Sequence, residues 1–115
     1  MVAIQRIAVI GTGLMGPGIA LEVARAGYDT VLIGRSTASL ERGMTSLAKA
    51  MDELMDHGIL EKEEQARIMA RVSSTTSLNE GVGKADYVIE SIIENLAIKQ
   101  ALFAQLDEIC PSHTI

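Results

Sequence analysis

The chain has 115 residues, which is the size of one domain. Hydrophobic residues make up 48% of it and aromatic residues only 3%, so a core can form and must be aliphatic. The net charge of −5, with acids and bases interspersed and no basic stripe, excludes nucleic acid as an expected partner.

The sequence also argues against a membrane or secreted protein. No apolar run approaches the roughly 20 residues of a membrane span. The short run 7–10 leads directly into Gly11, which is not the plan of a signal peptide. Cys110 is the single cysteine, so an internal disulfide and a metal cluster are excluded, and we interpret it as a buried hydrophobe. We expect a cytoplasmic protein without a membrane partner.

The first half of the chain alternates strand and helix patterns. Residues 4–10 form a short apolar run, typical of a strand that is buried on both faces of a parallel sheet. Residues 14–26 have helical spacing and stop at Gly27, a common helix-ending residue. A second apolar strand is predicted over 30–33.

The middle of the chain predicts two more helices. Ser36 is a suitable N-cap for a long amphipathic helix that ends near Gly58. A shorter helix follows, opened by acidic residues at Glu61, Glu63 and Glu64, which favour the positive end of the helix dipole.

The last third predicts two strands, a helix and the beginning of a further strand. The strands are expected at 72–76 and 87–92, with a turn at 81–83 between them. Asn95 caps the last helix, and residues 113–115 lead into the further strand.

This alternation predicts an α/β fold of the Rossmann type, a doubly wound parallel sheet with right-handed crossovers. A finished sheet of this kind needs about six strands, and this chain supplies at most about five. We therefore expect residues 1–115 to be a dinucleotide-binding domain, the N-terminal portion of a longer enzyme whose C-terminal helical domain is absent. An exposed edge at the fifth strand predicts self-association, as in a homo-oligomer.

A G-x-G-x-x-G motif lies between the first strand and the first helix, the context that marks a dinucleotide-binding turn. We expect the first glycine to permit a sharp turn, the second to let a diphosphate approach the backbone, and the third to let helix and strand pack closely. Gly18 is expected to allow further close packing. The first-turn N–H groups would face the phosphates. The predicted cofactor-binding residues here are Gly11, Thr12, Gly13, Leu14, Met15 and Gly16.

The end of the second strand bears on the choice of cofactor. An acid normally follows this strand and holds the adenosine ribose hydroxyls. This chain has Gly34, Arg35 and Ser36 there, and Asp29 comes too early to serve. Arg35 can pair with a 2′-phosphate, and Ser36 can donate a hydrogen bond to it. These residues favour NADP over NAD.

The sequence resembles the 3-hydroxyacyl-CoA dehydrogenases. The resemblance rests on the run 9–16, on Leu40-Glu41-Arg42-Gly43, and above all on 90–106, which matches E-x-x-x-E-N-L-x-x-K-x-x-L-F-x-x-L. Residues 113–115 also resemble the family's lead into its fifth strand. The match spans nearly the whole chain.

The resemblance implies a function for the parent enzyme. It would transfer hydride between a 3-hydroxyacyl-CoA and a nicotinamide cofactor in fatty acid metabolism. Glu94 and Lys99 match family positions that line the cofactor cleft after the fourth strand. The family usually has Asp where this chain has Gly34, so the resemblance implies NAD, whereas the residues favour NADP. Family members often carry a polar residue near position 50 that contacts coenzyme A, and Ala50 cannot make that contact.

The resemblance implies a catalytic His–Glu pair with assisting Ser and Asn, at positions that we expect beyond residue 115. His57 and His113 match none of these positions, so we assign no catalytic residue and no metal ligand to the chain. The fragment alone is expected to bind cofactor and not to turn over substrate.

Other readings stay open. A 3-hydroxyisobutyrate or 6-phosphogluconate dehydrogenase would share the glycine turn and Arg35, but the insertion 40–71 argues against it. A non-catalytic nucleotide-binding or redox-sensing module is a further alternative. FAD or S-adenosylmethionine is disfavoured because no acid follows the second strand.

Overall fold

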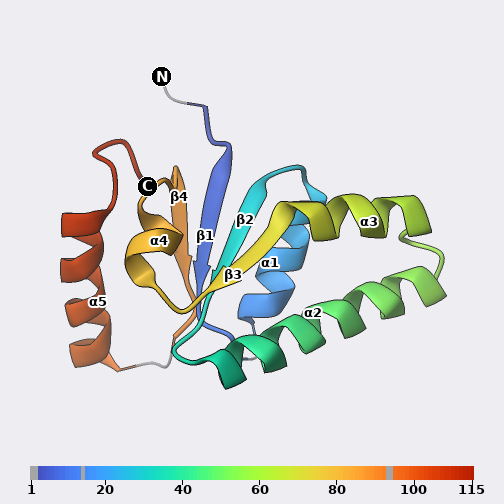
Figure 1. Ribbon diagram of the computed structural model, residues 1–115, viewed down its shortest axis with the longest axis horizontal. Helices are drawn as coiled ribbons and strands as arrows, with labels where there is room; N and C mark the ends of the chain where they lie inside the picture. The colour runs from blue at the N-terminus through green and yellow to red at the C-terminus, as the bar shows by residue number, and fades with distance from the viewer. Residues whose placement is uncertain (1–2, 14, 93–94) are drawn as a thin grey trace.

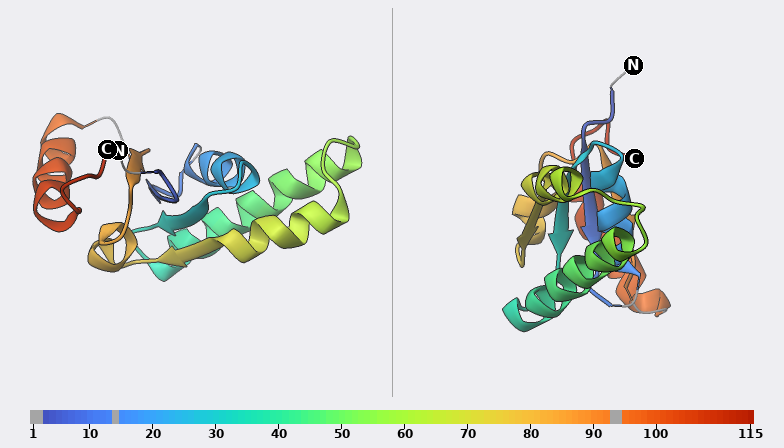
Figure 2. Two further views of the ribbon diagram at one scale, coloured as in Figure 1. Left: turned by 90° about the horizontal axis from the view of Figure 1, so that it is seen from above. Right: turned by 90° about the vertical axis from the view of Figure 1, so that its right-hand side faces the viewer.

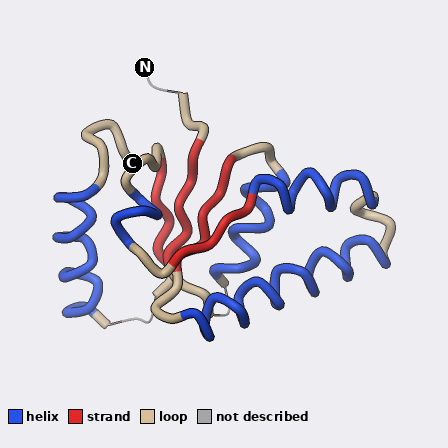
Figure 3. The backbone as a smooth tube through the Cα atoms, in the orientation of Figure 1, coloured by secondary structure: helices blue, strands red, loops and turns tan. Residues whose placement is uncertain are grey.

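The computed structural model describes residues 3–13, 15–92 and 95–115. Its centre is a parallel four-stranded sheet in the order β3-β2-β1-β4 (Figure 1 and Figure 3). This confirms the predicted α/β fold. The strands are β1 (Arg6–Ile10), β2 (Asp29–Ile33), β3 (Val72–Thr75) and β4 (Tyr87–Glu90). The helices are α1 (Gly16–Arg25), α2 (Thr37–Asp56), α3 (Lys62–Arg71), α4 (Leu78–Val82) and α5 (Leu96–Ile109).

The sheet has a hydrophobic layer on each face. Successive side chains of a strand point to opposite faces, so the continuous apolar run of β1 serves both layers. Ile7 and Val9 pack with residues of α1, α2 and α3. Ala8 and Ile10 pack on the other face with residues of α4 and α5. All four are buried, as the sequence predicted for this strand.

The helix α2 extends away from the sheet, and after a short connection α3 returns towards it (Figure 1 and Figure 2). Ser36 caps α2 as predicted: its Oγ accepts a hydrogen bond from the Ser39 amide at 3.1 Å, and Ser39 Oγ accepts from the Ser36 amide at 3.2 Å. Leu47 and Met51 anchor the helix in the core. Within the described ranges, neither α2 nor any other helix is long and apolar enough to cross a membrane.

The turn predicted over 81–83 is wrong for Gly81 and Val82, which end the short helix α4, whereas Gly83 lies in the turn that follows it. Ser77 Oγ caps this helix by accepting from the Glu80 amide at 3.2 Å. Gly81 is buried, and a Cβ added to it would collide with the Ile33 side chain. The glycine therefore lets α4 sit closely on β2, a tertiary requirement that the sequence pattern did not reveal.

The last residue of the chain runs alongside β4. The Ile115 amide donates to the Asp86 carbonyl at 3.0 Å, and the Val88 amide donates to the Ile115 carbonyl at 2.8 Å. These two bonds form the ladder pattern of a parallel strand pair. They agree with the prediction that residues 113–115 lead into a further strand.

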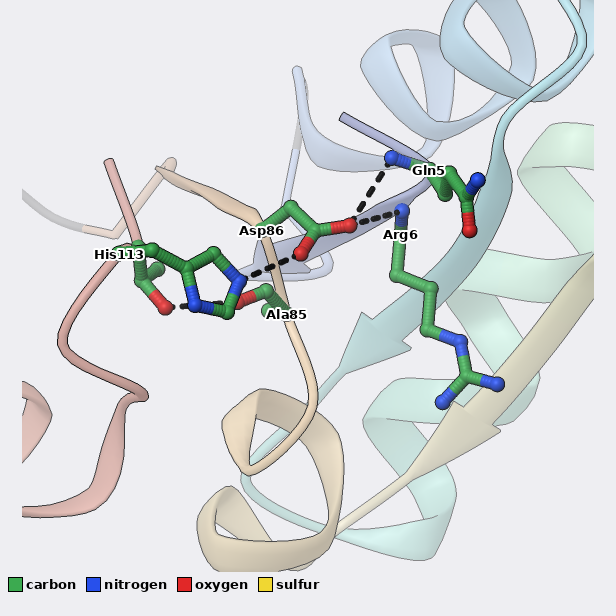
Figure 4. A network of polar contacts seen from close by, with 6 residues as sticks. Gln5, Arg6, Ala85, Asp86 and His113 are labelled. Atoms are coloured by element: carbon green, nitrogen blue, oxygen red, sulfur yellow. Dashed lines mark hydrogen bonds and ion pairs between the residues drawn. The ribbon is translucent and has the colours of Figure 1, made fainter. Parts of the chain in front are cut away.

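Asp86 joins three chain segments at the amino-terminal edge of the sheet (Figure 4). Its Oδ2 accepts from the amides of Gln5 at 2.9 Å and Arg6 at 3.0 Å, and its Oδ1 lies 2.7 Å from Nε2 of His113. These contacts, the Gln5 hydrogen bond foremost, lower the pKa of Asp86 from 3.8 to about 2. The ionised carboxylate thus ties β1 and the segment around His113 to the beginning of β4.

We predict that Asp86 stabilises the fold in a pH-dependent way. Since its pKa is lower in the folded chain, the stabilisation is fully present above pH 3.8 and is lost as the pH falls towards about 2. Asp86→Asn should lower the urea midpoint at neutral pH, and its difference from the parent should shrink across that window. Asp52→Asn, at an exposed position on α2, is the control. A difference that stays constant down to pH 2 would contradict this role.

Candidate functional site

A cavity of about 500 Å³ lies at the carboxyl ends of β1 and β2 and against the segment that follows β4. The neighbouring strands β1 and β4 lead to helices on opposite faces, α1 in one layer and α5 in the other. Such a switch point is where open α/β sheets bind ligands. The cavity is lined by Ile10, Gly11, Thr12, Gly13, Ile33, Gly34, Arg35, Ser39, Arg42, Thr76, Leu78, Ser91, Ile92 and Ile98.

The glycine turn is required by close backbone approach at two positions. Gly11 has a φ of 116°, and a Cβ there would lie 2.8 Å from the Ser91 carbonyl carbon and collide with its oxygen. A Cβ on Gly16 would collide with the Gly11 carbonyl. The turn off β1 is thus pressed between α1 and the segment after β4. This geometry agrees with the sharp turn and close packing expected of these two glycines.

Gly13 has a different environment, because a Cβ added there would meet nothing within 4 Å. The space beside it belongs to the cavity. The helix α1 begins next to it at the N-cap Met15, with no side-chain cap and no acidic residue in its first turn. Because Pro17 has no N–H, the first-turn amides are those of Gly16 and Gly18, and they are available to an anionic ligand such as the diphosphate that the motif predicts.

The prediction for Gly18 is wrong, because it is exposed and a Cβ added to it would also meet nothing within 4 Å. It therefore allows no close packing.

The second wall of the cavity comes from the end of β2 and the first turns of α2. Gly34 and Arg35 line it, whereas Ser36 does not and serves as the cap of α2. A Cβ on Gly34 would lie 2.9 Å from Ser39 Oγ and 3.0 Å from Thr12 Cγ2. The position at which the resemblance implies an Asp is therefore already crowded by neighbouring side chains.

Two residues of α2 line this wall and were missed by sequence reasoning, namely Ser39 and Arg42. They lie three residues apart and so share one face of the helix. The sequence did contain a signal for them, because Ser39 and Arg42 follow the Ser36 cap at intervals of three residues and so lie on one face of the predicted helix.

The third wall comes from Ser91, Ile92 and Ile98, and an ion pair is joined to it by a hydrogen bond to the Ile92 amide. Glu90 Oε1 lies 2.9 Å from Lys99 Nζ, and Glu90 Oε2 accepts from the Ile92 amide at 3.1 Å. The Lys99 hydrogen bond is the main cause of a lowered pKa at Glu90, opposed by burial. Lys99 is thus held against the β4–α5 connection, and it is not among the residues that line the cavity.

The remaining predicted residues have the following places. Met15 is exposed at the start of α1 and, like Gly16, does not line the cavity. Leu14 and Glu94 lie outside the described residues. Sequence reasoning did not single out Glu90, although it opens the run that carried the family resemblance.

Neither histidine is near the cavity. His57 Nδ1 lies 2.7 Å from the Glu53 carbonyl at the end of α2, and His113 contacts Asp86 at the opposite edge of the sheet. Among the described lining residues the ionisable groups other than hydroxyls are the two arginines. This arrangement is suited to holding a large anionic ligand rather than to moving protons.

Comparison with known proteins gives the same picture. Residues 6–115 match the family model described as 3-hydroxyacyl-CoA dehydrogenase, NAD binding domain. The chain is 36% identical over 115 residues to 3-hydroxyadipyl-CoA dehydrogenase of Escherichia coli (strain K12), and it covers 24% of that protein. The crystal structure of (S)-3-hydroxybutyryl-CoA dehydrogenase from Ralstonia eutropha matches with a TM-score of 0.92 and 30% identity, over 98% of this chain and 40% of that one. The chain thus spans less than half of either protein.

The alternative dehydrogenase class is less similar. The 3-hydroxyisobutyrate dehydrogenase of Mycobacterium tuberculosis matches with a TM-score of 0.61 at 17% identity, which shows a shared fold alone. The family model, by contrast, covers nearly the whole chain. The chain therefore belongs to the 3-hydroxyacyl-CoA dehydrogenase family, and it matches the NAD-binding domain of that family.

Proposed function

We propose that this chain holds the nicotinamide cofactor of an enzyme that transfers hydride between a 3-hydroxyacyl-CoA and that cofactor. The observation that carries the proposal is the cavity at the switch point, where the open space beside Gly13 meets the uncapped start of α1. Such a site accepts a diphosphate through backbone amides and the helix dipole. When bound, the nicotinamide ring supplies the hydride chemistry.

The residues of the chain divide the work of holding the cofactor. The glycine turn, residues 11–16, receives the diphosphate. The β4–α5 connection bounds the other end of the cavity, where Glu94 and Lys99 are proposed to serve the ribose and nicotinamide side. Lys99 does not line the cavity itself, but Glu90 joins its ammonium group to the backbone of Ile92, which does.

We also propose that the cofactor is NADP rather than NAD. Gly34 presents no carboxylate to repel a 2′-phosphate, and its Cβ position is occupied by neighbouring side chains. Arg35 lines the cavity directly after β2, where the adenosine ribose is received. A guanidinium there matches a phosphate in charge and shape.

Gly13→Ala is predicted to weaken nicotinamide nucleotide binding by at least about tenfold, because the new methyl group occupies the space of the diphosphate. Gly18→Ala is the matched control, since its added Cβ also has open space but lies outside the cavity. It should leave affinity unchanged and raise stability by about 0.5–1 kcal/mol. Calorimetric titration and thermal unfolding measure both effects. Equal affinities for the two variants would contradict the placement of the diphosphate.

Arg35→Ala is predicted to weaken NADP binding by about tenfold, the equivalent of one charge-assisted hydrogen bond, and to leave NAD binding nearly unchanged. Arg67→Ala, at an exposed arginine of α3 outside the cavity, is the control. The parent should bind NADP more tightly than NAD in the same titration. Tighter binding of NAD by the parent would remove the proposed preference.

The 115-residue chain by itself is predicted not to oxidise a 3-hydroxyacyl-CoA. Neither His57 nor His113 lies at the cavity, and no acid lines its described part, so a general base is not positioned there. Nicotinamide absorbance during incubation with 3-hydroxybutyryl-CoA should stay flat while cofactor binding is retained. Sustained turnover that copurifies with the chain would refute this expectation.

A further inference from the structure

The charge around the cavity is opposite in sign to that of the whole protein. The chain carries 15 acidic and 10 basic side chains other than histidine, for a net charge of −5. The described lining of the cavity nevertheless holds two arginines, Arg35 and Arg42, and no acid. A positive cavity in an acidic protein indicates an anionic ligand, and the position of this charge indicates which part of the ligand it meets.

We propose that Arg42 is a second specificity-determining residue, which acts with Arg35 to form the binding site for the 2′-phosphate of the adenosine ribose. This inference rests on the proposed function of the chain and deepens it. The position of Arg35 after β2 suggested its role from the sequence. Arg42 lies in the second turn of α2, and only the folded structure shows that it lines the same cavity.

Packing fixes the helix that carries Arg42 against the glycine turn. The next residue, Gly43, is buried, and a Cβ there would lie 3.1 Å from Thr12 Cβ and 3.2 Å from Leu32 Cδ2. The glycine therefore permits α2 to approach the turn and β2 closely. Ser39, one turn before, lines the same cavity, so this face of α2 forms its wall.

The side chains of Arg35 and Arg42 are also available to a ligand. Within the described ranges, neither side chain forms an ion pair or a hydrogen bond, and both residues are exposed. Other cations are engaged elsewhere: Arg71 donates to the Ala24 carbonyl at 2.9 Å, and Arg25 lies 3.8 Å from Glu22. Two unengaged guanidinium groups at the start of α2 suit a phosphate dianion, which the helix dipole also favours.

The experiment compares nucleotides that differ only in the 2′-phosphate. Calorimetric titrations of the parent, Arg42→Ala and Arg42→Lys use NADP against NAD, and adenosine 2′,5′-bisphosphate against AMP. Arg42→Ala should weaken binding of the two 2′-phosphorylated ligands by about tenfold and leave NAD and AMP within about twofold. Arg42→Lys should recover part of the loss, because a lysine keeps the charge without the planar fork. Lys49→Ala, farther along α2 and outside the cavity, should bind like the parent.

The outcomes separate this inference from the proposed function. If Arg42→Ala weakens NADP and NAD equally, the arginine stacks on the adenine or supports the fold, and its assignment to the phosphate is wrong. If neither affinity changes, the assignment is also wrong, although the proposed function stands. If the parent binds none of the four nucleotides, the proposed function fails as well.

Discussion

The structure depends on a backbone contact that leaves no room for a side chain. At the carboxyl end of β1, the glycine turn is pressed between the start of α1 and the Ser91 carbonyl, and a Cβ on Gly11 or Gly16 would collide with backbone atoms. This contact brings the first helix and the segment after β4 to the same point. Gly13, two residues after Gly11 in the same turn, has open space beside it and lines the cavity. The proposed diphosphate site therefore depends on glycines, whose lack of a side chain allows the close contact and leaves space for the ligand.

Close packing around a glycine also shapes the wall of the cavity at the end of β2, where we propose that the adenosine is bound. Where the family usually has an acid, Gly34 has neighbours that already occupy the position of a Cβ. The charge of the site then comes from Arg35 and Arg42, and the described lining contains no acid to oppose them. A 2′-phosphate is the part of a nicotinamide nucleotide that gains most from such an arrangement. The proposed preference for NADP thus depends on the contact of α2 with the glycine turn.

Local patterns were sufficient for the strands, for the longer helices and for the Ser36 and Asn95 caps, because apolar period and capping chemistry act within a few residues. They predicted the Ser36 cap and the turn at Gly11 from the same physics that the structure shows. They failed where contacts between residues far apart in the sequence determine the local structure or the lining of the site. Gly81 was interpreted as a turn because its packing on β2 cannot be read from its neighbours. Arg42 and the Glu90–Lys99 pair were missed because each joins the site only when separate elements meet.

The proposed site for a nicotinamide nucleotide is the start of α1. Backbone amide resonances of the protein titrated with NADPH test it most directly. We expect the amide resonances of Gly13 and Gly16 to shift most, with smaller shifts at Gly34 and Arg35. A second hollow lies near the amino-terminal ends of the strands, beside Arg6 and Lys84. Shifts confined to that hollow, or no shifts at saturating nucleotide, would contradict the account.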